Sequence, residues 1–133
     1  MEDKLKDIIN RGLYGNPEIK PEERNIFLTT IIERIHLALT KKQVIHKGMY
    51  DQAVTLLSKS NNIHLYINGN LSYSLYSNYV KEANKHNIPF TVVNANEQTP
   101  IGLVIATENQ AINKSDIFIK DSFYEMEFHI NEK

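Results

Sequence analysis

Residues 63–93 alternate short apolar runs with an amphipathic stretch, and this rhythm constrains the fold more than any other feature. Residues 63–67 and 90–93 are rich in β-branched and aromatic side chains, which is typical of strands. Between them, in residues 75–83, apolar side chains recur every three or four positions, as on a helix with one buried face. A helix of this length can join two parallel strands, so the sequence predicts a strand–helix–strand unit with a right-handed crossover.

Upstream of this unit, residues 27–40 fit two interpretations. Their apolar residues match one face of a helix, but residues 35–39 also alternate as a strand would. Thr40 and Gln43 have the spacing of a capping box, in which two side chains bond each other's backbone where a helix begins. We therefore favour a strand over residues 33–39, followed by a helix that runs to about Ser60.

Three apolar segments follow the unit. Residues 101–106 form an apolar run too short for an ordinary helix, which predicts a buried strand, and residues 116–120 suggest another. In residues 124–131 apolar and polar side chains alternate strictly. That pattern predicts a strand at an edge of the sheet, or one that pairs with a second chain in a homo-oligomer.

Together these elements predict one domain of the α/β (α+β) class. We expect a three-layer sandwich around a mixed, mostly parallel sheet of four to five strands, built on a βαβαβ core. Residues 1–20 would supply an N-terminal docking helix and connector, residues 27–120 the α/β core, and residues 121–133 the C-terminal edge strand.

Charge and cysteine content narrow the functions that this domain can have. The chain carries 15 Lys and Arg against 16 Asp and Glu, whereas a non-specific nucleic-acid binder usually shows a basic stripe. The absence of cysteine excludes disulfides and thiolate catalysis and fits a reducing cytoplasm. No apolar run approaches the length of a membrane span, and no signal peptide is evident. We therefore expect a cytoplasmic protein without membrane contact.

The sequence contains none of the motifs that usually carry catalysis. No two histidines have the helical spacing of a metal site, and neither a nucleophile elbow nor a glycine-rich phosphate loop is present. We therefore expect no catalytic residues, no metal and no cofactor, although an enzyme without a recognisable motif stays open.

A small basic cluster is the first candidate binding site. It comprises Lys41, Lys42, His46, Lys47 and Gly48, at the start of the helix that follows the first strand. Such a cluster can hold a phosphate with help from the N–H groups at a helix start. The alternative is an ordinary solvated surface, because so few charges form only a small patch.

Amide-rich loops after two predicted strands form a second candidate site. Its residues are Asn68, Gly69, Asn70, Asn94, Asn96 and Glu97. Open α/β sheets place ligands at such strand ends, and we expect Glu108 near the same edge. The alternative is a polar turn that hydrogen-bonds its own backbone, because asparagine readily occupies turns.

An ordered series of short motifs covers roughly residues 11–120. It includes Leu13-Tyr14-Gly15, Pro21-Glu22-Glu23-Arg24, Glu33-Arg34-Ile35, Ile67-Asn68-Gly69, Ile88-Pro89-Phe90 and Ile101-Gly102-Leu103-Val104. In these motifs the chain resembles the YueI-like family of small proteins from Gram-positive bacteria, a domain of unknown function without assigned catalytic residues. The resemblance implies a cytoplasmic α/β domain with a mixed sheet, similar to the ribosomal-protein and Bacillus chorismate mutase type of fold.

Residues 43–105 also resemble the kink-turn RNA-binding ribosomal proteins in the order of their elements. Those proteins grip RNA with a Gly-Ala-Asn-Glu type sequence at the start of the first crossover helix. Here the matching place reads Lys47-Gly48-Met49-Tyr50-Asp51, so the asparagine is missing and the acid is displaced. The resemblance therefore carries over no RNA contacts, since a shared fold does not define a function.

These observations favour a non-catalytic binding domain in one of three versions. The first binds structured RNA through the basic cluster. The second places a small polar ligand, as a binding protein or an enzyme would, at the strand ends or at a subunit interface. The third is a structural module that self-associates through residues 124–131.

Overall fold

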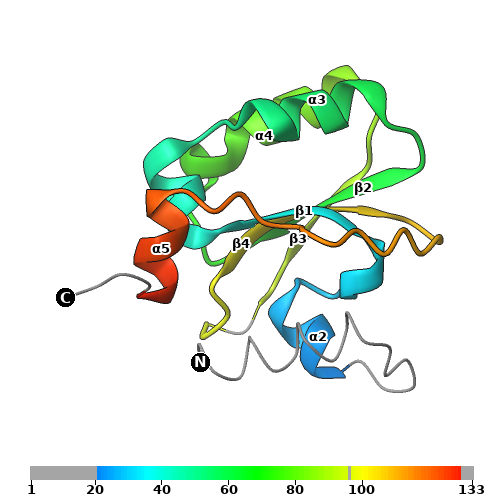
Figure 1. The fold of residues 1–133 in the computed structure, drawn as a ribbon. Coiled ribbons are helices and arrows are strands. Elements are labelled where there is room, and N and C mark those ends of the chain that lie inside the picture. Colours follow the sequence, from blue (N-terminus) through cyan, green and yellow to red (C-terminus); the bar gives the residue numbers. More distant parts are fainter. Residues whose placement is uncertain (1–20, 96, 130–133) are drawn as a thin grey trace.

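The computed structural model describes residues 21–95 and 97–129, so the docking helix and connector expected in residues 1–20 lie outside the described residues. Four strands form one mixed sheet in the order β1-β4-β2-β3 (Figure 1). They are β1 (Ile35–Thr40), β2 (Ile63–Asn68), β3 (Phe90–Val93) and β4 (Ile101–Thr107).

The expectation of a mostly parallel sheet is wrong, because β4 runs antiparallel to both of its neighbours and only β2 and β3 pair in parallel. The connection from β3 to β4 spans residues 94–100. A parallel return needs a crossover of about a dozen residues or more, so the chain turns back instead. As a result β4 lies between β1 and β2, and every one of its residues is buried.

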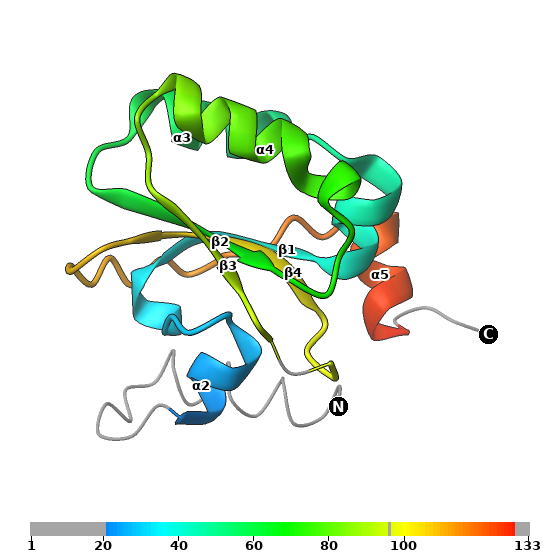
Figure 2. The same cartoon turned by 180° about the vertical axis from the view of Figure 1, so that it is seen from behind.

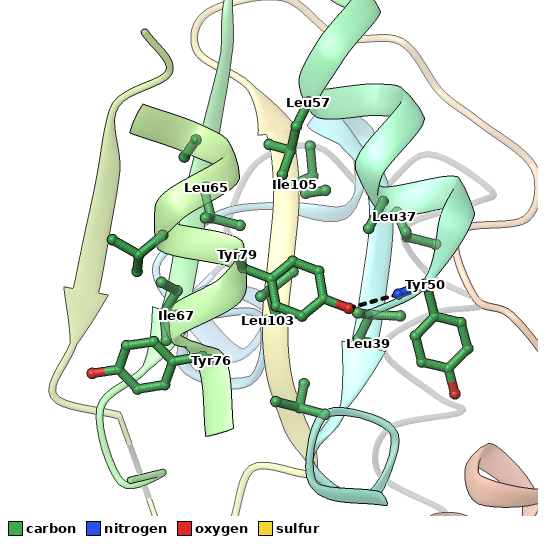
Figure 3. Close-up of a cluster of buried hydrophobic side chains, with 14 of the residues drawn as sticks. Leu37, Leu39, Tyr50, Leu57, Leu65, Ile67, Tyr76, Tyr79, Leu103 and Ile105 are labelled. Carbon is green, nitrogen blue, oxygen red and sulfur yellow. Dashed lines mark hydrogen bonds between the residues drawn. The ribbon is translucent and has the colours of Figure 1, made fainter. Parts of the chain in front are cut away.

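The helices lie on both faces of the sheet. One face is covered by α3 (Asp51–Lys59) and α4 (Tyr73–Lys85), and the other carries α2 (Pro21–Ile26), as the two opposite views show (Figures 1 and 2). Leu65, Ile67 and Leu103 of the sheet pack against α3 and α4, and Tyr79 of α4 belongs to the same buried cluster (Figure 3). The expected strand–helix–strand–helix–strand order is confirmed, although β1 and β2 are not hydrogen-bonded neighbours.

The strand interpretation is confirmed for residues 35–39, which lie in β1, whereas residues 33 and 34 belong to the short 3-10 helix η1 (Ile32–Arg34). Thr40 and Gln43 form the expected capping box: the backbone N–H of Thr40 donates to Gln43 Oε1 at 2.8 Å, and that of Gln43 donates to Thr40 Oγ1 at 3.1 Å. The helix that follows is divided, however. A π-helical turn, η2 (Gln43–Lys47), ends at Gly48 before α3 begins.

The C-terminal part departs most from expectation. Residues 116–120 do not form a strand: they pair with β1 through one isolated bridge, in which Ala38 N donates to Ile117 O at 2.8 Å, and the side chains of Ile117 and Phe118 pack on the sheet. The strand predicted over residues 124–131 is wrong where the structure describes it, since the chain forms α5 (Ser122–Phe128).

A helix forms at this position because Asp121 caps it, its carboxylate accepting from Tyr124 N at 2.9 Å. Tyr124 and Phe128 stand four residues apart, so both lie on one helical face and pack on Phe118, with ring centroids 5.3 and 6.1 Å away. Alternation alone did not distinguish this helix from a strand.

Candidate functional site

Both candidate binding sets meet at one end of the sheet. Because β4 runs opposite to the other strands, its start lies at the same end of the sheet as the ends of β1, β2 and β3. The Lys41 ammonium group donates to Glu97 O at 2.9 Å, and its backbone N–H donates to Pro100 O at 2.8 Å. The structure therefore brings together one residue from each predicted set.

The second set is largely occupied by bonds within its own turns. Asn68 is fully buried, and its side chain donates to Ile101 O at 3.0 Å and accepts from Asn70 N at 2.8 Å. The Asn70 side chain donates to Ala95 O at 3.1 Å. This geometry matches the interpretation of a self-bonded polar turn.

The backbone at Gly69, just after β2, also lies very close to the end of β3. Gly69 N donates to Val93 O at 2.8 Å, and a Cβ added to Gly69 would lie only 2.8 Å from that oxygen. The side chains of Asn94 and Glu97 are exposed beyond this contact, and Asn96 lies outside the described residues.

Glu108 does not lie near that edge, contrary to expectation, because the antiparallel β4 carries it to the opposite end of the sheet. There its carboxylate lies 3.4 Å from His64 Nδ1, and His64 Nε2 lies 2.7 Å from Thr91 Oγ1. In residues 21–95 and 97–129, no three His, Asp or Glu side chains lie close enough to hold a metal ion. Nor does this part of the chain contain a helix long and apolar enough to cross a membrane.

The basic cluster spans the turn η2 and the residues on either side of it, where α5 packs. The backbone N–H of Lys42 donates to the Glu127 carboxylate at 2.8 Å, and the His46 ring stacks on Phe123 at 5.6 Å between centroids. The side chain of Lys47 is exposed. The carboxylate of Glu127 thus lies close to the backbone of Lys42, which lowers the local excess of positive charge.

A hydrogen-bond network that the sequence did not reveal lies next to this cluster. Buried Tyr50 donates through its phenol to Asp121 at 2.5 Å, and the Gln43 side chain donates to the same carboxylate at 3.1 Å. Burial and the bond to Asp121 raise the pKa of Tyr50. Burial opposes ionisation of Asp121, but the bonds from Tyr50, Tyr124 N and Gln43 outweigh it and lower the pKa of that carboxyl.

Tyr79 extends the network into the core. Its hydroxyl accepts from Tyr50 N at 3.0 Å, drawn as a dashed line in Figure 3, and donates to Gly48 O at 2.5 Å. Burial raises the pKa of this phenol as well. Gly48 has φ 80° and ψ −114°, a conformation that residues with a side chain rarely adopt. Glycine is therefore the residue that fits this turn.

An open groove runs beside this network, between α3 and residues 114–121. Its wider part has a volume of about 550 Å³, and a narrower part of about 260 Å³ continues it to Tyr50 and Asp121. The two parts share Asp51, Gln52 and Ile119. The apolar lining of the wider part consists of Leu37, Leu56, Phe118 and Ile119.

Charged side chains stand along the groove. Asp51 and Asp116 line the wider part together with Lys114, whose ammonium group donates to His36 O at 2.9 Å. Burial and the nearby charge of Lys114 lower the pKa of His36. Lys47 lines the narrower part, with its ammonium nitrogen 5.9 Å from the centre of the Tyr50 ring. Of the basic cluster, only Lys47 therefore borders the groove.

The fold and the groove describe a small α+β domain with a four-stranded mixed sheet, and comparisons place it in a family. Residues 2–118 match the family described as "Protein of unknown function (DUF1694)", so the chain belongs to this family. The uncharacterized protein YueI of Bacillus subtilis (strain 168) is 42% identical over 124 residues, which are 92% of this chain and 93% of that protein.

A solved relative has the same fold. The crystal structure of the YueI protein from Bacillus subtilis superposes with a TM-score of 0.80 at 41% identity, covering 95% of this chain and 98% of that one. The predicted resemblance to the YueI-like family is thereby confirmed. The likenesses to chorismate mutase and to kink-turn ribosomal proteins stay predictions.

Proposed function

We propose that the protein is a non-catalytic binding domain and that its ligand lies in the groove between α3 and residues 114–121. The observation that carries this proposal is the continuity of the groove, whose parts of about 550 and 260 Å³ share three lining residues. Small-molecule sites are typically concave and mostly apolar, with a few polar groups that fix orientation. The apolar side chains and scattered carboxylates of this groove fit that description.

The charges favour a ligand with an apolar body and a cationic amine or guanidinium group. Asp51 and Asp116 both line the wider part against a single cation, Lys114, so the charged side chains of its lining carry an excess of one negative charge. A cation placed between these carboxylates would gain Coulomb energy, whereas a phosphate or carboxylate would be repelled. The groove therefore suits a small amine better than a nucleic acid.

Phenethylamine and agmatine are suitable probes, with phenylacetate as the anionic counterpart of the first. We expect both amines, at about 10 mM, to shift the NMR amide signals of α3 and residues 114–119, because fragment-sized ligands bind weakly. Phenylacetate should shift them less. The proposal fails if no signal of these segments responds to either amine.

Charge-neutralising variants test the assignment of the groove. Asp51→Asn and Asp116→Asn should each weaken the response to agmatine, since each removes one carboxylate from the lining. Glu82→Gln is the matched control, because Glu82 lies on α4 and pairs with His86 at 3.3 Å. An equal response in all three variants would place the binding elsewhere.

Binding of structured RNA is a second candidate, supported by the position of Lys41, Lys42 and Lys47 around one short helical turn. A gel shift at low salt with a kink-turn hairpin tests it against the triple Lys→Ala variant. Removing phosphate contacts weakens binding and flattens its salt dependence. Lys81→Ala with Lys85→Ala on α4 is the control, and unchanged binding by the triple variant would reject this candidate.

A further inference from the structure

The two edge strands of the sheet, β1 and β3, differ in whether another segment covers their outer side. Along the outer side of β1, Ala38 N donates to Ile117 O, and the Lys114 ammonium group caps His36 O. Residues 114–120 thus cover that edge. Along the outer side of β3, no segment of the described chain pairs with the strand. A strand edge left open in this way offers unpaired N–H and C=O groups to another chain.

The hydrogen bonds to β2 show which groups these are. Leu65 N donates to Pro89 O at 3.0 Å, and Gly69 N donates to Val93 O at 2.8 Å. Since the direction of backbone groups alternates along a strand, residues 89, 91 and 93 face β2. Phe90 and Val92 therefore direct both their N–H and their C=O groups away from the sheet.

The side chains of the same two residues remain exposed. Phe90 and Val92 are 38% and 45% accessible, although both are large and apolar. Residues 87–95 contain no Asp, Glu, Lys or Arg. Natural sheets usually protect an open edge with such charges, and here none would repel an identical strand.

We propose that a second copy of this chain pairs with β3, antiparallel and about a two-fold axis, to form a continuous sheet across a dimer. A two-fold interface must be self-complementary, and a neutral strand with apolar side chains meets that requirement. The partner is a copy of the chain rather than a charged peptide, because residues 87–95 carry no charged side chain that would complement one.

One register uses every free backbone group. With Thr91 on the axis, Phe90 of each copy lies opposite Val92 of the other. Each such pair can exchange two N–H···O bonds, so four bonds satisfy all the outward groups of both strands. The same register brings the Phe90 and Val92 side chains of the two copies together on one face.

This inference does not depend on the proposed function. The groove borders β1, at the opposite edge of the sheet from β3, so a β3 dimer would leave both grooves open. Failure of amine binding would leave the dimer unaffected, and a monomeric protein would leave the groove intact.

Sedimentation equilibrium of the full chain over a concentration series tests the proposal. The wild-type chain should sediment at twice its monomer mass. Val92→Pro should raise the dimer dissociation constant about a hundredfold, because two hydrogen bonds are lost, one at each symmetric position. An edge strand accepts proline where its N–H faces outward, so the monomer should still fold, as circular dichroism would verify.

A charged pair of variants gives a matched comparison. Val92→Lys should also yield monomers, whereas Ile45→Lys should not, although Ile45 is 42% exposed and equally aliphatic. A wild-type monomer at millimolar concentration, or a dimer that survives both Val92 variants, would overturn the proposal.

Amide exchange gives a readout specific to the strand edge. In the dimer, the amide hydrogens of Phe90 and Val92 should exchange slowly, and dilution to monomer should accelerate them while Thr91 N stays protected by β2. Equal protection of Phe90 and Val92 at all concentrations would contradict pairing through this edge.

Discussion

The phenol of Tyr50 donates a 2.5 Å hydrogen bond to the carboxylate of Asp121, which lies 71 residues further along the chain. Tyr50 precedes the first residue of α3, and Asp121 caps α5. The same carboxylate accepts from Gln43 of the capping box. One acidic side chain thus holds three elements together beside the groove.

Replacing Tyr50 by Phe should lower the free energy of unfolding by about 2 kcal/mol, the usual range for a hydrogen bond to a charged group. Urea denaturation measures this change. Tyr73→Phe is the control, because Tyr73 is 58% exposed, and it should change stability by less than about 0.5 kcal/mol. The double variant with Asp121→Asn should lose less than the sum of the single losses, since both remove the same bond.

Stability should fall in acid because of Asp121. Its pKa is lowered in the folded state, so its contribution is present above the ordinary value of 3.8 and is lost as the pH falls through the folded value. Urea denaturation at pH 6 and pH 3 should show a larger loss for the wild type than for Asp121→Asn. Equal losses would mean that this carboxylate is not specially stabilised.

Alkaline titration should separate the tyrosines. The pKa values of Tyr50, Tyr66 and Tyr79 are raised, chiefly by burial, so these phenols should stay protonated above pH 10 while the chain is folded. Stability should then fall as the pH rises above 10, because the unfolded chain releases those protons first. Absorbance of phenolate should show a delayed phase that coincides with unfolding, and Tyr79→Phe should make that phase smaller.

Gly48→Ala should destabilise the fold by about 1 to 3 kcal/mol, because the φ of 80° at this position is strained for a residue with a Cβ. Thermal unfolding measures the effect. Lys47→Ala, one residue earlier and exposed, should cost less than about 0.5 kcal/mol. A neutral Gly48→Ala variant would contradict the backbone conformation described at this turn.

Local patterns predicted those elements whose signals are themselves local. The β-branched segments became β1, β2 and β3, and the capping box at Thr40 and Gln43 formed with both reciprocal bonds. The direction of β4 was missed although a signal existed, since residues 94–100 are too few for a parallel crossover. The helix α5 was missed because Tyr124 and Phe128 fit a helical face as well as an alternating strand.

The candidate site was predicted only in part. The sequence singled out Lys47 and Gly48, which border the Tyr50 network, but Lys41 proved to bond Glu97 O, and the backbone of Lys42 bonds the Glu127 carboxylate near α5. No sequence pattern connects Tyr50 with Asp121, because their contact depends on how the segments that carry them pack in the fold. Asp121 is recognisable in the sequence only as a helix cap.

The central place of β4 also governs how the chain can fold as it is synthesised. Residues 35–93 leave the ribosome first, yet β1 has no hydrogen-bonded strand neighbour among them. The native hydrogen bonds of β1 to the sheet can therefore form only after residues 101–107 have emerged to lie between β1 and β2. Assembly of the sheet is thus postponed until β4 has been translated.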